Sequence, residues 1–281
     1  MEIARDGLVF RPAGTPKARV GFFTTCVMEV MFPRVNHEVV RLLVLAGAEV
    51  VSPRAQTCCG ALHAHAGLRR DAKALARTNV AAFDAGAFDF IVTDSAGCGA
   101  AMREFDHLLH DDDAHEAAGR FAARVRDVSE VLVELGLPAP TARLASARDP
   151  GQPLRVGYHD PCHLAHAQRV RTQPRRLLKA LPGVTLVELA NSDWCCGSAG
   201  VYNLTHPDMA NAQLAQKLDT IERSGAEVVV ASNPGCQLHM ERGARARGLA
   251  VPMTHLAELM GRAYPAPGDT PRSAPAGPAA R

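Results

Sequence analysis

Short apolar runs alternate with longer amphipathic stretches along most of this chain. In the first half, buried strands are predicted by the apolar runs at 19–23, 49–51 and 88–92. Helical periodicity is found between and after them, at 33–45, 68–83 and 128–135. The second half repeats this order, with strands predicted at 155–158, 184–189 and 227–231 and helices at 174–181 and 210–224. Strands that alternate with helices predict an α/β fold with parallel sheets.

The two halves are interpreted as tandem copies of one α/β unit, each with a short parallel sheet. Arg155-Val156-Gly157-Tyr158 repeats Arg19-Val20-Gly21-Phe22 at an offset of 136 residues. We expect a first domain at residues 19–137 and a second at 154–263, joined by a linker at 138–153 that contains four prolines. The two ends, 1–18 and 264–281, have no apolar period, so we expect a flexible leader and a disordered tail.

Composition excludes several classes of protein. The chain has 281 residues and is 47% hydrophobic, which suits two ordinary globular domains. Its net charge of +2 is small and its basic residues are spread out, so a nucleic-acid partner is not expected. The sequence has no apolar run long enough to span a bilayer and no apolar signal core at its start. We expect a cytoplasmic protein, with at most a peripheral association at the inner membrane face through a complex.

All eight cysteines of the chain belong to the duplication. In each half a single cysteine is followed, after 31 or 32 residues, by a Cys-Cys-Gly step, and after a further 38 or 39 residues by a fourth cysteine. The first set is Cys26, Cys58, Cys59 and Cys98, and the second is Cys162, Cys195, Cys196 and Cys236. Every cysteine lies just beyond a predicted strand. Because ligands gather outside the carboxyl ends of parallel strands, we expect each set to converge on one site.

Four thiolates suit an iron-sulfur cluster or a tetrahedral zinc ion. Structural zinc sites usually draw on short Cys-x2-4-Cys knuckles, which this sequence lacks, so the spacing favours a cluster and leaves zinc as the alternative in at least one site. A redox-active dithiol and inert core thiols are the remaining interpretations, since disulfides are rare in a reducing cytosol. The glycines beside the cysteines allow backbone amides to donate to sulfur; they are Gly60, Gly97, Gly197 and Gly235.

Histidines are frequent beside the cysteines: they are His63, His65, His159, His163 and His166. One of them joining a metal site or relaying a proton is one interpretation. Capping, hydrogen bonding or lining a surface for a partner is the other. The sequence has no P-loop, no nucleophile elbow, no His-Glu-x-x-His motif and no Gly-x-Gly-x-x-Gly fingerprint. We therefore expect no nicotinamide or flavin site in this chain and assign no catalytic residue.

The long motifs around these cysteines resemble a known family. Cys58-Cys59-Gly60-Ala61-Leu62-His63, Tyr158-His159-Asp160-Pro161-Cys162-His163 and Cys195-Cys196-Gly197-Ser198-Ala199-Gly200 are similar to the iron-sulfur subunit of bacterial glycolate oxidase. That subunit belongs to the cysteine-rich (CCG) domain, or heterodisulfide reductase B-subunit, superfamily. The similarity runs from about Arg19 to Met260.

The resemblance implies an electron-transfer subunit with one 4Fe-4S cluster in each domain, bound by the eight cysteines named above. Its partner would be a flavoprotein subunit that oxidises glycolate to glyoxylate, and the electrons would pass toward the respiratory chain. FAD is expected only in that partner. The alternative assignments are the iron-sulfur subunit of a lactate-utilisation oxidase and a heterodisulfide reductase-like thiol-disulfide reductase.

The sequence departs from the family pattern at two places. The family subunit normally begins with a ferredoxin-like domain, but no cysteine precedes Cys26. The start is then truncated, that domain is a separate chain, or this is a shorter lactate-utilisation relative. The second departure is at Ser95 and Asn233, where heterodisulfide reductase motifs have an additional cysteine. Four cysteines per site argue against a thiol-disulfide reductase and leave an ordinary cluster in each half.

Overall fold

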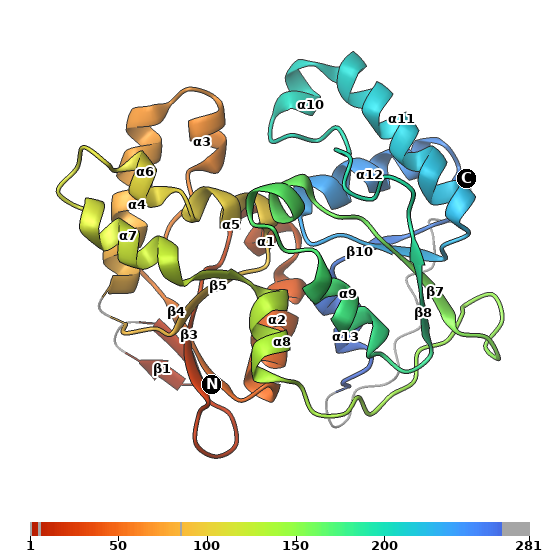
Figure 1. Ribbon diagram of the computed structural model, residues 1–281, viewed down its shortest axis with the longest axis horizontal. Coiled ribbons are helices and arrows are strands. Elements are labelled where there is room, and N and C mark those ends of the chain that lie inside the picture. Colours follow the sequence, from red (N-terminus) through yellow and green to blue (C-terminus); the bar gives the residue numbers. More distant parts are fainter. Residues whose placement is uncertain (1, 5–6, 85, 266–281) are drawn as a thin grey trace. The chain divides into compact units, whose positions relative to one another are not determined.

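The computed structural model describes residues 2–4, 7–84 and 86–265. Contacts between Cα atoms divide the chain into two compact units, Met1–Pro138 and Ala139–Arg281. Each unit is an α/β structure built on one sheet (Figure 1). The fold class predicted from the sequence, two tandem α/β units with short parallel sheets, is confirmed.

The first unit holds six strands and eight helices among its described residues. The strands are β1 (Glu2–Ala4), β2 (Gly7–Phe10), β3 (Ala18–Phe22), β4 (Ala48–Pro53), β5 (Phe90–Thr93) and β6 (Val125–Asp127). The helices are α1 (Cys26–Met31), α2 (Pro33–Leu45), α3 (Ala61–His65), α4 (Arg69–Asp84), α5 (Ala96–Met102), α6 (Phe105–Leu108), α7 (His115–Arg124) and α8 (Val128–Leu135).

Strands β3 to β6 form the parallel part of the first sheet, whose full order is β1-β2-β4-β3-β5-β6. Strand β2 joins the β4 edge antiparallel, and β1 pairs antiparallel with β2. The prediction of a flexible leader over residues 1–18 is therefore wrong for 2–4 and 7–10. β2 becomes a strand because β4, a partner far away in the sequence, offers it an edge, and β2 in turn pairs with β1.

Helices cover both faces of the first sheet. From β3 the chain moves to β4 and then crosses back to β5, so right-handed crossovers put α2 and α4 on opposite faces. Helix α8 packs with α2, and α7 packs with α4 (Figure 1). Gly21 in β3 permits this packing, because a Cβ there would lie 2.8 Å from the Phe83 ring of α4. The core on this face includes stacked and edge-on pairs of Phe23, Phe83 and Phe121.

The second unit repeats the plan with an all-parallel sheet of order β10-β9-β7-β8. Its strands are β7 (Leu154–Tyr158), β8 (Val184–Glu188), β9 (Val228–Val230) and β10 (Met253–Thr254). Its helices are the π-helix η1 (His163–Ala167), α9 (Thr172–Lys179), α10 (Tyr202–Thr205), α11 (Pro207–Ser224), α12 (Pro234–Ala246) and α13 (Leu256–Gly261). Helices α11 and α12 pack together, as do α9 and α13 (Figure 1).

The segment predicted as a linker, 138–153, has no helix or strand but is attached to the second unit. Leu144 N–H donates to the Pro182 carbonyl, and Ser146 donates its hydroxyl to Glu227 at 2.5 Å. Of the predicted tail, Tyr264 is buried, and residues 266–281 lie outside the described residues. None of the described helices is both long enough and apolar enough to cross a bilayer.

Candidate metal centres

In the first unit, three strand ends bring four thiols together. Cys26 begins α1 after β3, Cys58 and Cys59 lie in the loop after β4, and Cys98 lies in α5 after β5. The Sγ atoms of Cys26 and Cys58 are 3.8 Å apart. The thiol of Cys59 interacts with those of Cys58 and Cys98. All four predicted ligands of this half therefore form one connected cluster at the carboxyl edge of the parallel strands.

The second unit builds the same cluster from equivalent elements. Cys162 follows β7, Cys195 and Cys196 follow β8, and Cys236 lies in α12 after β9. The Cys195 thiol interacts with those of Cys162 and Cys196, and Cys196 interacts in turn with Cys236. All eight cysteines lie in the described part of the chain and are free of disulfides. Cys26 is exposed, whereas Cys59, Cys196 and Cys236 are buried.

Backbone amides donate to the sulfurs of both Cys-Cys-Gly steps. The N–H of Gly60 donates to Cys58 Sγ at 3.5 Å, and that of Gly197 donates to Cys195 Sγ at 3.3 Å. Both glycines have left-handed backbone conformations, with φ of 80° and 92°, which residues with a Cβ rarely adopt. The glycine at each step is therefore needed to aim the amide at the thiol.

The fourth cysteine of each cluster has a side-chain donor three residues before it. Asn233 Nδ2 donates to Cys236 Sγ at 3.4 Å, and Ser95 donates to Cys98. These are the two positions where the heterodisulfide reductase pattern would have a further cysteine. In this chain they supply hydrogen bonds to sulfur, which stabilise the thiolate form.

The thiols of each cluster share their protons unequally. A hydrogen bond from Cys26 lowers the pKa of Cys58 to about 2, and one from Cys162 lowers the pKa of Cys195 to about 2. The pKa values of the donors, Cys26 and Cys162, are raised by the same hydrogen bonds. Cys58 and Cys195 are thus held toward the thiolate form, which is the form that binds metal.

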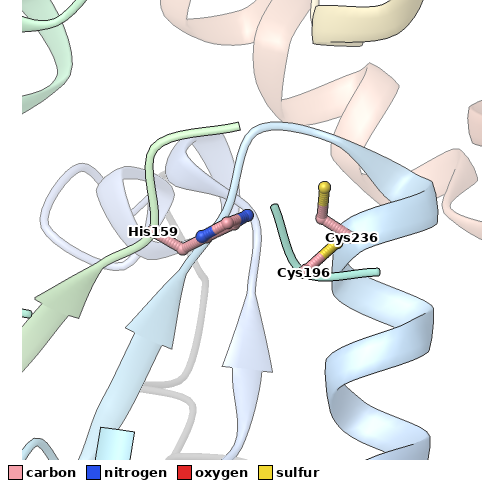
Figure 2. A group of neighbouring side chains, drawn as sticks. All are labelled: His159, Cys196 and Cys236. Atoms are coloured by element: carbon pink, nitrogen blue, oxygen red, sulfur yellow. The ribbon is translucent and has the colours of Figure 1, made fainter. Parts of the chain in front are cut away.

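His159 lies in the second cluster, beside Cys196 and Cys236. Its side chain is fully buried at the end of β7, and one ring nitrogen lies within 4.8 Å of the Cys196 and Cys236 sulfurs, which also lie within that distance of each other (Figure 2). Nδ1 lies 3.1 Å from the Ser192 carbonyl oxygen. Of the other histidines, His63 interacts electrostatically with Cys58, whereas His65 and His166 are exposed.

The donor sets fit a metal-sulfur group. Each unit offers four soft sulfur ligands with N–H groups aimed at them, as iron-sulfur clusters require. The separation of 3.8 Å between Cys26 and Cys58 also suits two thiolates around one zinc ion at about 2.3 Å. Metal and sulfide analysis separates these two occupants.

A family model described as a cysteine-rich domain (CCG) matches the chain twice, at residues 20–103 and 156–241. Each match contains one complete cluster of four cysteines. The two matches together cover more than half of the chain, and each lies within one of the two α/β units.

Curated relatives share this similarity. The chain is 40% identical over 250 residues to the probable glycolate oxidase iron-sulfur subunit of Bacillus subtilis, covering 88% of this chain and 55% of that protein. It is 34% identical to the Escherichia coli glycolate oxidase iron-sulfur subunit, covering 84% of this chain and 56% of that one. It is 30% identical to lactate utilization protein A of an Exiguobacterium strain, covering 86% of this chain and 96% of the relative.

The chain spans about half the length of the glycolate oxidase subunits that it matches, and nearly the whole length of lactate utilization protein A. All three alignments cover more than four fifths of this chain. With two matches to the family model, each enclosing four converging thiols, the chain belongs to the cysteine-rich (CCG) domain family and carries two tandem copies of that domain.

Proposed function

We propose that this chain is the iron-sulfur electron-transfer subunit of a 2-hydroxy-acid oxidase, with glycolate as the substrate of the complex. One observation carries the proposal: in each unit, four thiols from three strand ends converge at the carboxyl edge of a parallel sheet. A chain that devotes all eight of its cysteines to two such clusters is suited to hold two redox centres.

The ligands of the proposed first 4Fe-4S cluster are Cys26, Cys58, Cys59 and Cys98, and those of the second are Cys162, Cys195, Cys196 and Cys236. When bound, each cluster would accept and release one electron at a time. The chain's own contribution is to hold the thiolates, to donate N–H groups to them and to exclude water from their buried members. The Gly60 and Gly197 amides perform the second of these roles.

The substrate is assigned by similarity to the glycolate oxidase subunits, which are the more identical relatives at 34% and 40%. A flavoprotein partner would oxidise glycolate to glyoxylate and hold the FAD. A ferredoxin-like domain or subunit would extend the electron path toward the respiratory chain. We place the complex in the cytoplasm, where free thiols persist, with peripheral association at the inner membrane face through its partners.

Lactate is the second candidate substrate, and a specific observation favours it. The alignment with lactate utilization protein A covers 96% of that protein, against 55% of the Bacillus glycolate oxidase subunit. The two candidates share the same role for this chain and differ only in the flavoprotein that supplies the electrons.

The first experiment is analysis of iron, acid-labile sulfide and zinc in anaerobically purified protein, with electron paramagnetic resonance (EPR) spectra before and after reduction. Two four-cysteine sites should give about eight iron and eight sulfide per chain. Zinc with little sulfide would refute the electron-transfer role and leave a structural one.

The second experiment identifies the electron source. The loaded protein is mixed anaerobically with candidate flavoprotein subunits and either glycolate or D- or L-lactate, and cluster reduction is followed by loss of visible absorbance. Reduction with glycolate alone supports the first assignment, and reduction with lactate alone replaces it with the second. A control without flavoprotein should show no reduction, because the proposed substrate site lies in the flavoprotein.

A further inference from the structure

The residues around the two clusters occupy equivalent positions in the two units, but some of these positions hold different side chains. The N–H of Phe23 donates to the Val92 carbonyl at 2.8 Å, and the N–H of His159 donates to the Val230 carbonyl at 2.9 Å. The preceding residues, Phe22 and Tyr158, pair with the same two valines. Phe23 and His159 therefore occupy one structural position, just beyond the central strand of each sheet.

This position is apolar in the first unit and polar in the second. Phe23 and His159 are both fully buried. Phe23 stacks on Phe83, whereas His159 points its imidazole at the Cys196 and Cys236 sulfurs (Figure 2). Nδ1 of His159 lies 3.1 Å from the Ser192 carbonyl oxygen, and the imidazole also forms a hydrogen bond with the Cys236 thiol. The second cluster therefore has a polar hydrogen-bonding ring where the first has an apolar one.

A second buried position differs in charge. Helices α4 and α11 share one register, since Ala72, Ala76, Val80 and Phe83 are buried in α4 and Ala210, Leu214, Leu218 and Ile221 are buried in α11, each pair 138 residues apart. The Cys-Cys-Gly glycines agree with this register, because a Cβ added to Gly60 would first meet Ala72 and a Cβ added to Gly197 would first meet Ala210. In this register Asn79 is equivalent to Lys217.

Asn79 and Lys217 both hold the loop that leads to the Cys-Cys-Gly step. Asn79 accepts from Thr57 N–H at 2.8 Å and donates to the Cys58 carbonyl at 3.0 Å. Lys217 donates to the Asn191 and Ser192 carbonyls at 2.7 and 3.2 Å. The loop is thus held by the neutral amide of Asn79 in the first unit and by the ammonium group of Lys217, which is 3% exposed, in the second.

The charge of Lys217 needs compensation, because burial lowers its pKa and disfavours the ammonium form. The strongest opposing interaction comes from the thiol of Cys196, followed by Asp193 and Cys236. A buried cation is stabilised when an anion lies close to it. A thiolate-bound cluster would supply that anion in the second unit.

A third pair of equivalent positions also makes the surroundings of the first cluster more negative than those of the second. Asp94 and Ser232 follow β5 and β9 at equivalent places, 138 residues apart, and both are fully buried. The Asp94 carboxyl group interacts electrostatically with Cys98. The first cluster thus has a carboxyl group where the second has a hydroxyl group.

We propose that the two sites are electrostatically unequal and that the second has the higher reduction potential, set by His159 and Lys217. The inference rests on the proposed iron-sulfur function. Reduction adds an electron to a centre that is already anionic, so a nearby cation stabilises the reduced form more than the oxidised form. A hydrogen bond to a ligating sulfur withdraws negative charge from the centre and also raises its potential, and His159 interacts in this way with Cys236.

The test is a potentiometric titration of anaerobically purified, cluster-loaded protein followed by EPR. We expect two midpoint potentials in the wild-type protein. Cys196→Ser should remove the signal with the higher potential, and Cys59→Ser should remove the one with the lower potential. Equal potentials, or the reverse assignment, would overturn the inference while leaving the electron-transfer role intact. Protein that holds zinc and no labile sulfide would overturn both.

Charge-removing variants test the cause. Lys217→Gln keeps a donor for the two carbonyls and should lower only the higher potential, whereas Lys179→Gln is the matched control. Lys179 is the last residue of α9 and is exposed, and it precedes the amino-terminal end of β8, whereas the cysteines follow the carboxyl ends of the strands. Its loss should therefore shift neither potential. If Lys217→Gln leaves both potentials unchanged, or moves both equally, the assignment to Lys217 is wrong.

His159→Phe installs the residue of the first unit at the equivalent position of the second. It should lower the higher potential and alter the shape of the corresponding EPR signal, without changing the other signal. His159→Gln is the companion variant, since its amide retains polarity if the phenylalanine variant fails to load the second site. If both variants load fully and neither changes the second signal, His159 has no part in setting the potential.

Discussion

The glycines of the two Cys-Cys-Gly steps give a matched pair of substitutions with different expected costs. Gly60 and Gly197 share a left-handed backbone and the same donation to a cysteine sulfur. Their surroundings differ. A Cβ on Gly197 would lie 2.3 Å from the Ala210 carbonyl oxygen, whereas a Cβ on Gly60 would come no closer than 3.4 Å to Ala72. The first contact is with helix backbone, which cannot rotate away.

The magnitudes follow from these contacts. Both alanine variants lose about 1–2 kcal/mol of unfolding free energy, because a residue with a Cβ is strained in the left-handed region. Gly197→Ala also forces α11 away from the loop, and overpacking of this kind costs about 1–3 kcal/mol more. We therefore expect a loss of about 1–2 kcal/mol for Gly60→Ala and about 2–5 kcal/mol for Gly197→Ala.

Hydrogen exchange followed by mass spectrometry is the assay, because it gives the stability of each unit separately. Gly197→Ala should weaken protection in β7 and β9, and Gly60→Ala should weaken it less in β3 and β5. Metal content is the second readout, since displacing the Gly197 amide removes a donor from Cys195. Equal losses in the two variants would refute the steric reasoning and leave only the shared backbone strain.

Three further predictions follow from buried groups. Burial raises the pKa of Asp94 from 3.8 to about 7, so the first unit should lose stability as pH rises between these values, and Asp94→Asn should flatten this slope in urea unfolding midpoints. Arg175→Met should cost about 3–5 kcal/mol, because it strands the Asp160 carboxylate that Arg175 contacts at 2.6 Å, and adding Asp160→Asn should restore part of the loss in thermal unfolding. Cys59→Ser and Cys196→Ser should each remove about half of the bound iron, and a variant that emptied both sites would contradict independent centres.

The elements that the sequence predicts correctly are those with a long local signal. The helix expected at 128–135 is α8, which begins after a capping box formed by Asp127 and Glu130 and ends before Gly136. The strand expected at 19–23 is β3, displaced by one residue. In both, residues close together in the sequence determine the structure: a cap and an apolar face in the first, and a continuous apolar run in the second.

The strands that the sequence does not reveal are short and depend on distant partners. β6 and β10 have three and two residues, and they exist because β5 and β9 offer parallel edges. Strand β2 lies in a stretch with glycine and proline nearby and is fixed by antiparallel pairing with β4. No periodicity can develop over two to four residues, so pairing across the sheet decides these elements.

The same distinction applies to the clusters. The cysteines could be predicted because their spacing repeats, and the strand order then places them together. Lys217 could not, because a lysine in an amphipathic helix looks like any solvated residue until the loop beside it is known. Lys217 stands out only when the two units are compared, because the equivalent position of the first unit holds the neutral Asn79.

The two units thus share the contacts that form within the Cys-Cys-Gly step and differ in the side chains that other elements bring to it. In both units a left-handed glycine aims an amide at the first cysteine of the pair, at 3.5 and 3.3 Å. These contacts depend on residues within the motif, so copying the motif copies them. The neighbours from the central strand and the covering helix lie outside the Cys-Cys-Gly step and differ between the units: they are Phe23 and Asn79 in the first and His159 and Lys217 in the second. In the proposed electron-transfer role, the shared cysteines would hold the same cofactor in both units, and the different neighbours would separate the two reduction potentials.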